Sequence, residues 1–412
     1  MKLSDQADGL QLSPQVDQTS AAPTSIIVEF KDKPQKTAML LAEEEGKTLS
    51  ATDAQDKVDA SHEKFGNDLK TIFKKDLDAN KNPYKIKRSY KNSFNGVAMT
   101  VPANRVKDLL KSNMVQAVYS DMKEQIEPPT LGQGSTQQAA THTMVTFPGI
   151  EKLHAEGYTG KGVKVGIIDT GIDYNHPDLK GAFKGGYDFV DNDNDPMETT
   201  YDDWKKSGQP ETAGGEAYYT EHGTHVAGIL AGQGKNTSTD MPVEGVAPDA
   251  DIYSYRVLGP YGSGSSSNII AGIDKAVSDG MDIISMSLGA NYNDPLYPDA
   301  IAVNNAVLAG VTAVVAAGNS GSSMYTLGSP GTSPLAITVG ASDTSVTIPT
   351  YKGTALASTG DLPADLKLAA KGMSDNIADF QGQTLQMVNV GLGGEASYSK
   401  RDPSTGNIHQ LM

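Results

Sequence analysis

Cysteine is absent from the 412 residues of this chain. The absence excludes disulfide bonds, thiolate metal sites and a cysteine nucleophile, but it does not fix the compartment. Apolar runs are also short, and none reaches the roughly 18 residues of a membrane-spanning helix. The first 18 residues are polar and lack the apolar stretch of about 7–15 residues found in a signal peptide. The sequence therefore predicts no membrane-spanning segment. It also indicates that the N-terminus is not that of an intact secretory precursor.

Positive charge is scarce relative to negative charge. Lys and Arg number 34 against 50 Asp and Glu, which gives a formal net charge of -16. Such a chain repels nucleic acid and anionic membranes, so we expect neither as a partner. With 412 residues and 38% hydrophobic content, the chain is long enough for two or three domains.

The N-terminal third has the pattern of a small α+β domain. Residues 1–23 are rich in Ser, Gln, Asp and Pro, and we expect a flexible lead-in there. Residues 24–123 are predicted to form one domain with a ferredoxin-like β-α-β-β-α-β order. Its predicted strands span residues 25–30, 84–90, 96–101 and 115–119, and its predicted helices span residues 53–75 and 104–111.

Residues 124–147 are rich in Pro, Gly, Gln and Thr, which predicts a linker or processing region. Over residues 148–380, short apolar strands alternate with Ala- and Gly-rich helices, which predicts an α/β domain built on a parallel sheet. The predicted strands are Val163–Ile168, Asp251–Val257, Met281–Met286, Val311–Ala316 and Ala336–Val339, and the helices begin near His222, Ser266 and Pro298. Ligands bind beyond the carboxyl ends of such strands, so the residues that follow each strand are candidate site residues.

The first predicted strand of this domain is followed by Asp169-Thr170-Gly171. One interpretation is an aspartate that caps a turn. Aspartic peptidases also use Asp-Thr-Gly, but they need a second carboxylate to share a proton, and Asp343-Thr344-Ser345 lacks the glycine. A single carboxylate at the mouth of the sheet is therefore the favoured interpretation.

Two further polar segments lie at predicted element ends. His222-Gly223-Thr224-His225 opens a helix of small residues, where His222 is expected over the sheet and its plain interpretations are a capping residue or half of a metal site. Zinc hydrolases of the His-Glu-x-x-His type space their histidines by four and place a glutamate between them, which disfavours a catalytic metal here. Asn319 follows the strand that ends at Ala316, and is either a turn residue or an amide that donates to an oxyanion.

Taken in order, the Asp169, His222 and Asn319 segments resemble those of the subtilase family of serine endopeptidases. The resemblance implies that Asp169 orients the imidazole, that His222 is the general base and then acid, and that Asn319 is an oxyanion-hole donor. The resemblance also implies that three short segments bind substrate. The plain alternative is that their glycines are ordinary loop residues. These residues are Gly262, Ser263 and Gly264 on one backbone edge, Ser287, Leu288 and Gly289 on the other, and Ala316, Ala317 and Gly318 beside the P1 pocket.

The domain at residues 24–123 is similar to the propeptide of this family, which assists folding and then leaves its C-terminal tail in the cleft as an inhibitor. Val118–Met122 resembles that tail, and processing is expected between about Met122 and Thr143. The partners implied are polypeptide substrates and the chain's own propeptide as an intramolecular inhibitor. The resemblance also implies an extracellular protein.

The family's nucleophile lies in Gly-Thr-Ser-Met-Ala at a helix start, and this segment is missing from the sequence. Ser333 is a poor substitute, because Pro334 and a predicted strand follow it. Residues 381–412 resemble the start of the protease-associated insert that larger extracellular subtilases carry between the Asn and Ser segments. The sequence therefore predicts a precursor fragment that lacks the serine and is inactive alone. The alternative is a non-catalytic inhibitor or folding module with a degenerate protease platform.

Calcium is the one cofactor implied, as a structural ion. Asp178 matches the family's calcium-binding aspartate, but the loop Ser238–Val243 is only loosely similar and contains a proline. An acidic stretch could also hold a cation, although a solvated surface is the favoured interpretation. It contains Asp188, Asp191, Asp193, Asp195, Asp202 and Asp203.

Overall fold

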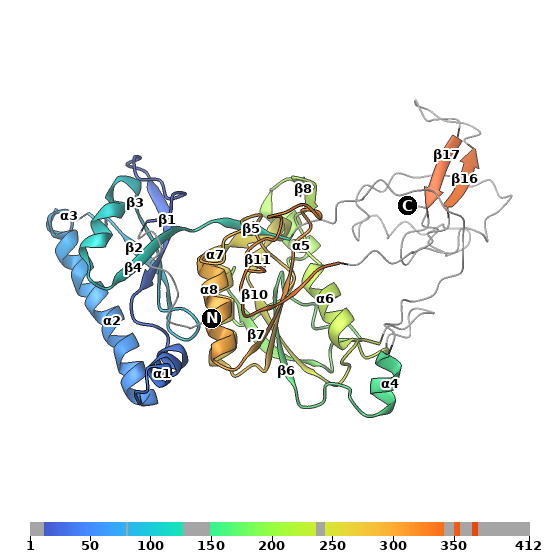
Figure 1. The fold of residues 1–412 in the computed structure, drawn as a ribbon. Coiled ribbons are helices and arrows are strands. Elements are labelled where there is room, and N and C mark those ends of the chain that lie inside the picture. Colours follow the sequence, from blue (N-terminus) through green and yellow to red (C-terminus); the bar gives the residue numbers. More distant parts are fainter. Residues whose placement is uncertain are drawn as a thin grey trace. The chain divides into compact units, whose positions relative to one another are not determined.

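The structure is a computed structural model that describes residues 12–79, 81–126, 149–235, 244–341, 350–354 and 365–369 (Figure 1). The chain divides into two compact units. The first unit joins Met1–Pro129 with Leu153–Gly340, and so contains the predicted N-terminal domain and most of the α/β domain predicted over residues 148–380, of which residues 148–152 and 341–380 fall in the second unit. In the second unit, β16 (Thr350–Thr354) and β17 (Asp365–Ala369) pair antiparallel. The predicted insert at residues 381–412 lies outside the described residues.

The N-terminal domain is a four-stranded antiparallel sheet in the order β2-β3-β1-β4. This order confirms the predicted ferredoxin-like fold. Its strands are β1 (Pro23–Phe30), β2 (Lys85–Tyr90), β3 (Gly96–Pro102) and β4 (Val115–Ser120). Its helices are α1 (Gln35–Glu44), α2 (Ala51–Ile72), α3 (Lys74–Asp78) and the 3₁₀ helix η2 (Ala103–Lys111). The sequence pattern missed α1, and η2 has the tighter 3₁₀ winding.

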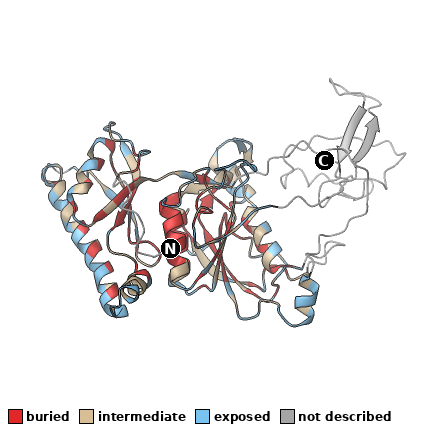
Figure 2. Cartoon of the chain, in the orientation of Figure 1, coloured by how far each residue is buried: buried red, intermediate tan, exposed pale blue. Residues whose placement is uncertain are grey.

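Helix α2 covers one face of this sheet. Ser50 caps its start by accepting a hydrogen bond from the Asp53 N–H. Val58, Phe65 and Leu69 are buried on one side, in accord with the helical spacing of these residues. Figure 2 shows the opposite side of α2 exposed along its length.

The expected flexible lead-in differs from the structure over residues 12–22. Leu12 forms a β-bridge with Val118, and the Ser13 N–H donates to the Val118 carbonyl at 2.9 Å. Val16 is buried against the same core. Two apolar side chains in an otherwise polar segment are enough to pack it against the sheet.

The second domain contains a six-stranded, all-parallel sheet in the order β15-β14-β13-β6-β10-β7. It confirms the predicted α/β class. The strands are β6 (Lys164–Asp169), β7 (Phe183–Asp188), β10 (Asp251–Arg256), β13 (Ile283–Met286), β14 (Thr312–Ala316) and β15 (Ile337–Val339). The helices are α4 (Ile150–Ala155), α5 (Tyr201–Ser207), α6 (His222–Ala231), α7 (Ser266–Ser278) and α8 (Pro298–Leu308). Shorter elements are β8 (Thr212–Ala213), β9 (Glu216–Ala217), β11 (Leu258–Gly259), η3 (Pro260–Gly262) and β12 (Ser263–Ser265).

Strand β7 was not predicted, because Gly185 and Gly186 favour a turn in a sequence pattern. Gly186 has φ +149°, and a Cβ there would lie 1.8 Å from the Ser254 carbonyl oxygen. Only glycine allows this close pairing of β7 with β10.

The acidic stretch is not simply a solvated surface, which corrects that interpretation for Asp188. Asp188 is buried and forms an ion pair with Arg256, which is also buried. Arg256 pairs with Asp191 at 2.7 Å as well. Farther along, Asp203 forms a capping box with Thr200 at the start of α5.

Helix α8 is buried along most of its length (Figure 2). It packs against α7, β14 and α1. Thr37 Oγ1, in α1, donates a 3.0 Å hydrogen bond to Asn305 Oδ1 in α8. The N-terminal domain therefore covers one face of the second domain's helix layer. Within the part of the chain that the structure describes, no helix is long and apolar enough to cross a membrane.

Gly96 provides a test of the N-terminal sheet. A Cβ at this position would lie 2.0 Å from the Val28 carbonyl oxygen and 2.9 Å from the Phe94 ring. We expect Gly96→Ala to lower the free energy of unfolding by at least about 1–3 kcal/mol, because β1 and β3 must separate. Gly66→Ala is the control, since a Cβ there meets nothing within 4 Å. It should stabilise α2 by up to about 1 kcal/mol. Equal denaturation midpoints for the two variants would contradict the close approach.

Candidate active site

Asp169 and His222 meet at the carboxyl end of the parallel sheet. Asp169 is the last residue of β6 and is 1% exposed, and His222 is the first residue of α6. His222 Nδ1 lies 2.8 Å from Asp169 Oδ1, which also accepts a 2.7 Å hydrogen bond from the Thr170 N–H. An aspartate in this position fixes the orientation of the imidazole ring and holds a proton on Nδ1.

The start of α6 is held against the end of β6 by side chains that satisfy its unpaired N–H groups. The Gly223 N–H donates to Thr170 Oγ1 at 2.9 Å, and the Thr224 N–H donates to Glu198 Oε1 at 2.9 Å. Glu198 is buried, and Thr220 Oγ1 donates to its Oε2 at 2.6 Å. The sequence pattern did not single out Glu198, because it lies in an irregular loop where no spacing marks it.

The electrostatic surroundings of His222 favour its charged form. Burial of the ring acts to lower its pKa, but the hydrogen bond to Asp169 and the charge of Asp169 outweigh burial. The negative charges of Glu198 and Glu216 act in the same direction, so the pKa of His222 is raised above its ordinary value. An imidazolium formed here would therefore be stabilised.

A cavity of about 200 Å³ brings the predicted site segments together. Its lining contains His222 and Asn319, and the predicted substrate-binding residues Ser287, Leu288, Gly289, Ala316 and Gly318. Ala317 is not part of the lining, since its N–H donates to Val339 and its carbonyl accepts from Gly328. Ser329 also lines this cavity. His222 and Asn319 are about 100 residues apart in sequence yet line the same hollow.

The chain occupies its own predicted substrate cleft. After β4, residues Lys123–Gln125 form β5, which pairs antiparallel with β12, so that Gln125 faces Ser263 and Glu124 faces Gly264. The Ile126 N–H donates to the Gly262 carbonyl at 2.9 Å, and Gln125 bridges to Gly289 on the other edge. A Cβ at Gly262 would lie 2.4 Å from Ile126, so the glycine allows this approach. Both predicted edges therefore hold one extended strand.

The segment in the cleft lies farther along the chain than the sequence indicated. Val118–Ser120 belong to β4 of the N-terminal sheet, where Val118 pairs with Val28. Backbone contact with the cleft begins at Met122, whose carbonyl accepts a 3.0 Å hydrogen bond from the Ser266 N–H. We call residues 122–126 the docked tail. It includes residues 124–126 of the predicted linker.

The N-terminal domain contacts helix α7 through Asp274, a buried residue of that helix. Its Oδ1 accepts 2.7 Å hydrogen bonds from the backbone N–H groups of both Asn92 and Ser93, in the turn between β2 and β3. Nearby, Tyr90 Oη donates to the Ser267 carbonyl at 2.8 Å. These contacts hold the N-terminal domain against α7, the helix that directly follows β12.

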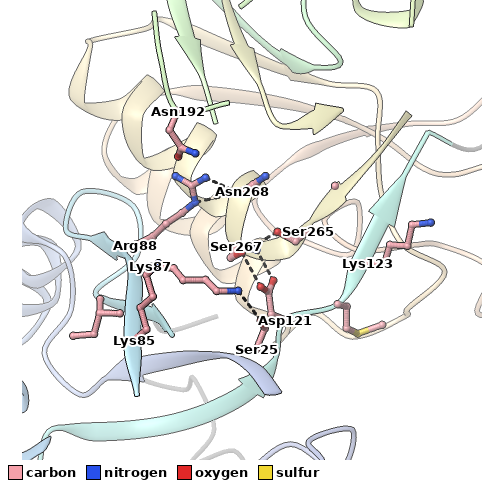
Figure 3. A pocket seen from close by; sticks show the side chains of 13 residues that line it. Ser25, Lys85, Lys87, Arg88, Asp121, Lys123, Asn192, Ser265, Ser267 and Asn268 are labelled. Carbon is pink, nitrogen blue, oxygen red and sulfur yellow. Dashed lines mark hydrogen bonds between the residues drawn. The ribbon is translucent and has the colours of Figure 1, made fainter. Parts of the chain in front are cut away.

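A wider cavity of about 660 Å³ lies beside this interface (Figure 3). Asp121 points toward Ser267 and accepts hydrogen bonds from its N–H and hydroxyl groups at 2.9 and 2.8 Å. Arg88 reaches Asn268 Oδ1 at 2.8 Å. The segment that leads from β4 into the cleft is therefore held to the start of α7 through Asp121.

The remaining candidate residues lie elsewhere. Ser333 is buried and donates to Asn304 Oδ1 at 2.6 Å, and His225 is exposed. Asp178 is buried and accepts a hydrogen bond from the Lys235 N–H, next to the undescribed residues 236–243. Among the described residues, no group of three or more His, Cys, Asp or Glu could hold a metal ion.

Comparison with known families agrees with this arrangement. The model of the subtilase family matches residues 160–407, and the model of peptidase inhibitor I9 matches residues 25–127. The first match spans the domain with the parallel sheet as far as residue 407, and the second spans the ferredoxin-like domain with its docked tail.

Two protease relatives of known sequence agree with these family matches. The chain is 37% identical over 394 residues to "Minor extracellular protease Vpr" of Bacillus subtilis, covering 94% of this chain and 44% of that protein. It is 35% identical to "Subtilisin E" of the same species, covering 67% of this chain and 63% of that protein. A solved structure of fervidolysin from Fervidobacterium pennivorans matches with TM-score 0.49 and 19% identity, covering 78% of this chain and 43% of that chain. The chain thus spans about half to two thirds of the length of these relatives.

Gly223 tests how closely α6 must approach Asp169. A Cβ there would lie 2.1 Å from the Gly171 carbonyl oxygen and 3.2 Å from the Asp169 Cβ. We expect Gly223→Ala to push the start of α6 away, lengthen the hydrogen bond to Asp169 and so lower the pKa of His222, as measured by NMR titration of the ring. Gly228→Ala in the same helix has open space and should leave that pKa unchanged. An unchanged His222 titration in Gly223→Ala would contradict this account.

Proposed function

The chain belongs to the subtilase family, and on that premise we propose that it is the precursor part of a serine endopeptidase that hydrolyses peptide bonds by Asp-His-Ser catalysis. One observation carries the proposal: His222, which is hydrogen-bonded to Asp169, lines the same cavity as Gly289, the residue to which Gln125 of the added strand bridges. The nucleophilic serine is proposed to come from sequence beyond these residues, because no Gly-Thr-Ser-Met-Ala segment is found in them.

The chain's own residues divide the work of proton transfer. With Nδ1 hydrogen-bonded to Asp169, the neutral His222 ring carries its lone pair on Nε2, where it can take the proton of a serine hydroxyl. The resulting imidazolium is stabilised by the Asp169 carboxylate, and it can return the proton to the leaving amine. Since the pKa of His222 is raised, this base is lost as the pH falls through that raised value.

Substrate and oxyanion contacts are proposed from the two edges and the cavity between them. A polypeptide would pair with Gly262–Gly264 on one side and Gly289 on the other, as residues 123–126 do. Asn319 lines the cavity with His222, where a side-chain amide could donate to the oxyanion of a tetrahedral intermediate.

The N-terminal domain is proposed to inhibit the same chain. Its tail occupies the strand position of a substrate, and the Asp274 and Tyr90 contacts anchor the rest of the domain on α7. Because the tail is tethered, its local concentration at the cleft is high, and a competing polypeptide is excluded.

We also propose that the protein is extracellular and that it binds a structural calcium ion. The first is supported by the name of the Bacillus subtilis relative. For calcium, Asp178 is the candidate ligand, and its Oδ1 accepts a hydrogen bond from the Lys235 N–H. No step of the reaction is assigned to the ion.

The catalytic assignments are tested by substitution in a polypeptide that includes the serine segment. His222→Ala should abolish self-processing, because the serine loses its base. Asn319→Ala should slow processing about 100- to 1,000-fold, as removal of one oxyanion donor does in subtilisin. His225→Ala is the matched control, since this residue is exposed on the same helix and should leave processing nearly unchanged.

The 412-residue polypeptide alone should cleave neither itself nor casein. Casein cleavage by the purified 412-residue chain that a serine-directed phosphonate blocks would overturn the proposed source of the nucleophile. Equal loss of processing in His222→Ala and His225→Ala, with recovery on adding zinc, would instead indicate a metal site.

A further inference from the structure

Glu124 is the one side chain of β5 that points into the protein. It is 0% exposed, while its neighbours Lys123 and Gln125 are exposed. This alternation follows from strand geometry, since successive side chains point to opposite faces. A carboxyl group of the docked tail is therefore buried against the start of α7, where Ser266 donates to it.

A second buried carboxyl group, that of Asp299, lies close enough for its charge to act on Glu124. Asp299, in the first turn of α8, is 0% exposed. Its Oδ1 accepts a 2.7 Å hydrogen bond from the Ala300 N–H and a 2.6 Å hydrogen bond from Ser329 Oγ. Glu124 Oε1 accepts a 2.6 Å hydrogen bond from Ser266 Oγ.

The two remaining oxygens need a proton between them. Glu124 Oε2 and Asp299 Oδ2 are buried and receive no hydrogen bond from the described residues if both carboxyl groups are ionised. The Ser266 hydroxyl that donates to Glu124 lies 3.2 Å from Tyr297 Oη, two residues before Asp299, and each carboxyl group shifts the pKa of the other, so the two groups share one buried region. Two buried carboxylates side by side would repel and lack donors, so a shared proton is the stable arrangement.

The proton belongs on Glu124. Asp299 has two donors at Oδ1 and lies in the first helical turn, where the helix dipole favours negative charge. Among the residues that the structure describes, only the Ser266 hydroxyl donates to Glu124. Burial and then the negative charge of Asp299 raise the pKa of Glu124 well above its ordinary value.

We propose that Asp299 is a specificity residue of this cleft, which accepts a side chain that donates a hydrogen bond, a protonated carboxyl or a primary amide, and rejects an ionised carboxylate. The tail's Glu124 is the occupant that the structure contains. The inference rests on the proposed function only where it extends from the tail to polypeptide substrates, for which glutamine would be preferred over glutamate at neutral pH.

A pH dependence of tail docking follows from this pairing. The titratable groups that face Glu124 are Asp299 and Tyr297 from the second domain and Asp121 from the tail itself. Because the docked state raises the pKa of Glu124, docking is strongest below the ordinary glutamate pKa of about 4.3 and weakens as the pH rises toward the raised value. Between the two values, the docking equilibrium should fall by up to about tenfold per pH unit.

Hydrogen–deuterium exchange of the 412-residue chain tests this without any catalysis. The reporters are peptides that cover residues 122–126 and 262–266, whose amides bond across the cleft. Protection is taken relative to an unstructured peptide at the same pH, at about pH 5 and about pH 8. The wild type should lose protection by at least about tenfold between these conditions.

Two variants should remove the pH dependence by different routes. Glu124→Gln keeps a donor for Asp299 and cannot ionise, and Asp299→Asn supplies an amide donor to an ionised Glu124. Both should keep the tail protected at about pH 8 and raise the thermal unfolding midpoint there above that of the wild type. Glu63→Gln, at an exposed position of α2, should behave as the wild type does.

The inference is overturned if wild-type protection does not change with pH, or if Glu124→Gln and Asp299→Asn lose protection as the wild type does. Neither result would affect the catalytic assignment of His222, which the processing experiments test separately. Conversely, a chain that never cleaves a peptide bond could still show the expected exchange behaviour.

Discussion

The pairing of residues 123–125 with residues 263–265 is the interaction on which the arrangement of the first unit depends. It brings the end of the N-terminal domain into the cleft of the second domain, and the antiparallel register determines which side chains point inward. Glu124 meets Asp299 only because of this register, and Ile126 reaches Gly262 only because that residue is a glycine.

The cleft in turn depends on the all-parallel sheet. Parallel strands place all their carboxyl ends at one edge, so short polar segments that follow β6, β13 and β14 converge there. Helix α6 completes the site because Thr170 and Glu198 satisfy its first N–H groups and Gly223 allows its close approach. The groups that hold α6 in place also orient His222. The same contacts therefore stabilise the fold and set the geometry of the site.

Much of this could be predicted from the sequence, for definable reasons. Asp169, His222 and Asn319 follow or begin regular elements, and their local motifs are specific, so their convergence follows from the fold class. Strand β7 was missed because Gly185-Gly186 favours a turn in any local pattern. Residue pairs formed across long sequence separations leave no local signal. Glu198 with Thr224, Asp274 with the turn at Asn92, and Glu124 with Asp299 are of this kind.

The central claim, that the chain's own tail lies as a strand in the substrate cleft, is tested most directly by disulfide cross-linking, because the chain has no cysteine of its own. Gln125→Cys with Ser263→Cys joins residues that face each other across the two strands, at a separation that a disulfide can span. Mild oxidation should give one intramolecular cross-link in high yield, whereas Gln125→Cys with Lys64→Cys, on the exposed face of α2, should give none. Failure of the first pair to cross-link, or equal yields from both pairs, would contradict the docked strand.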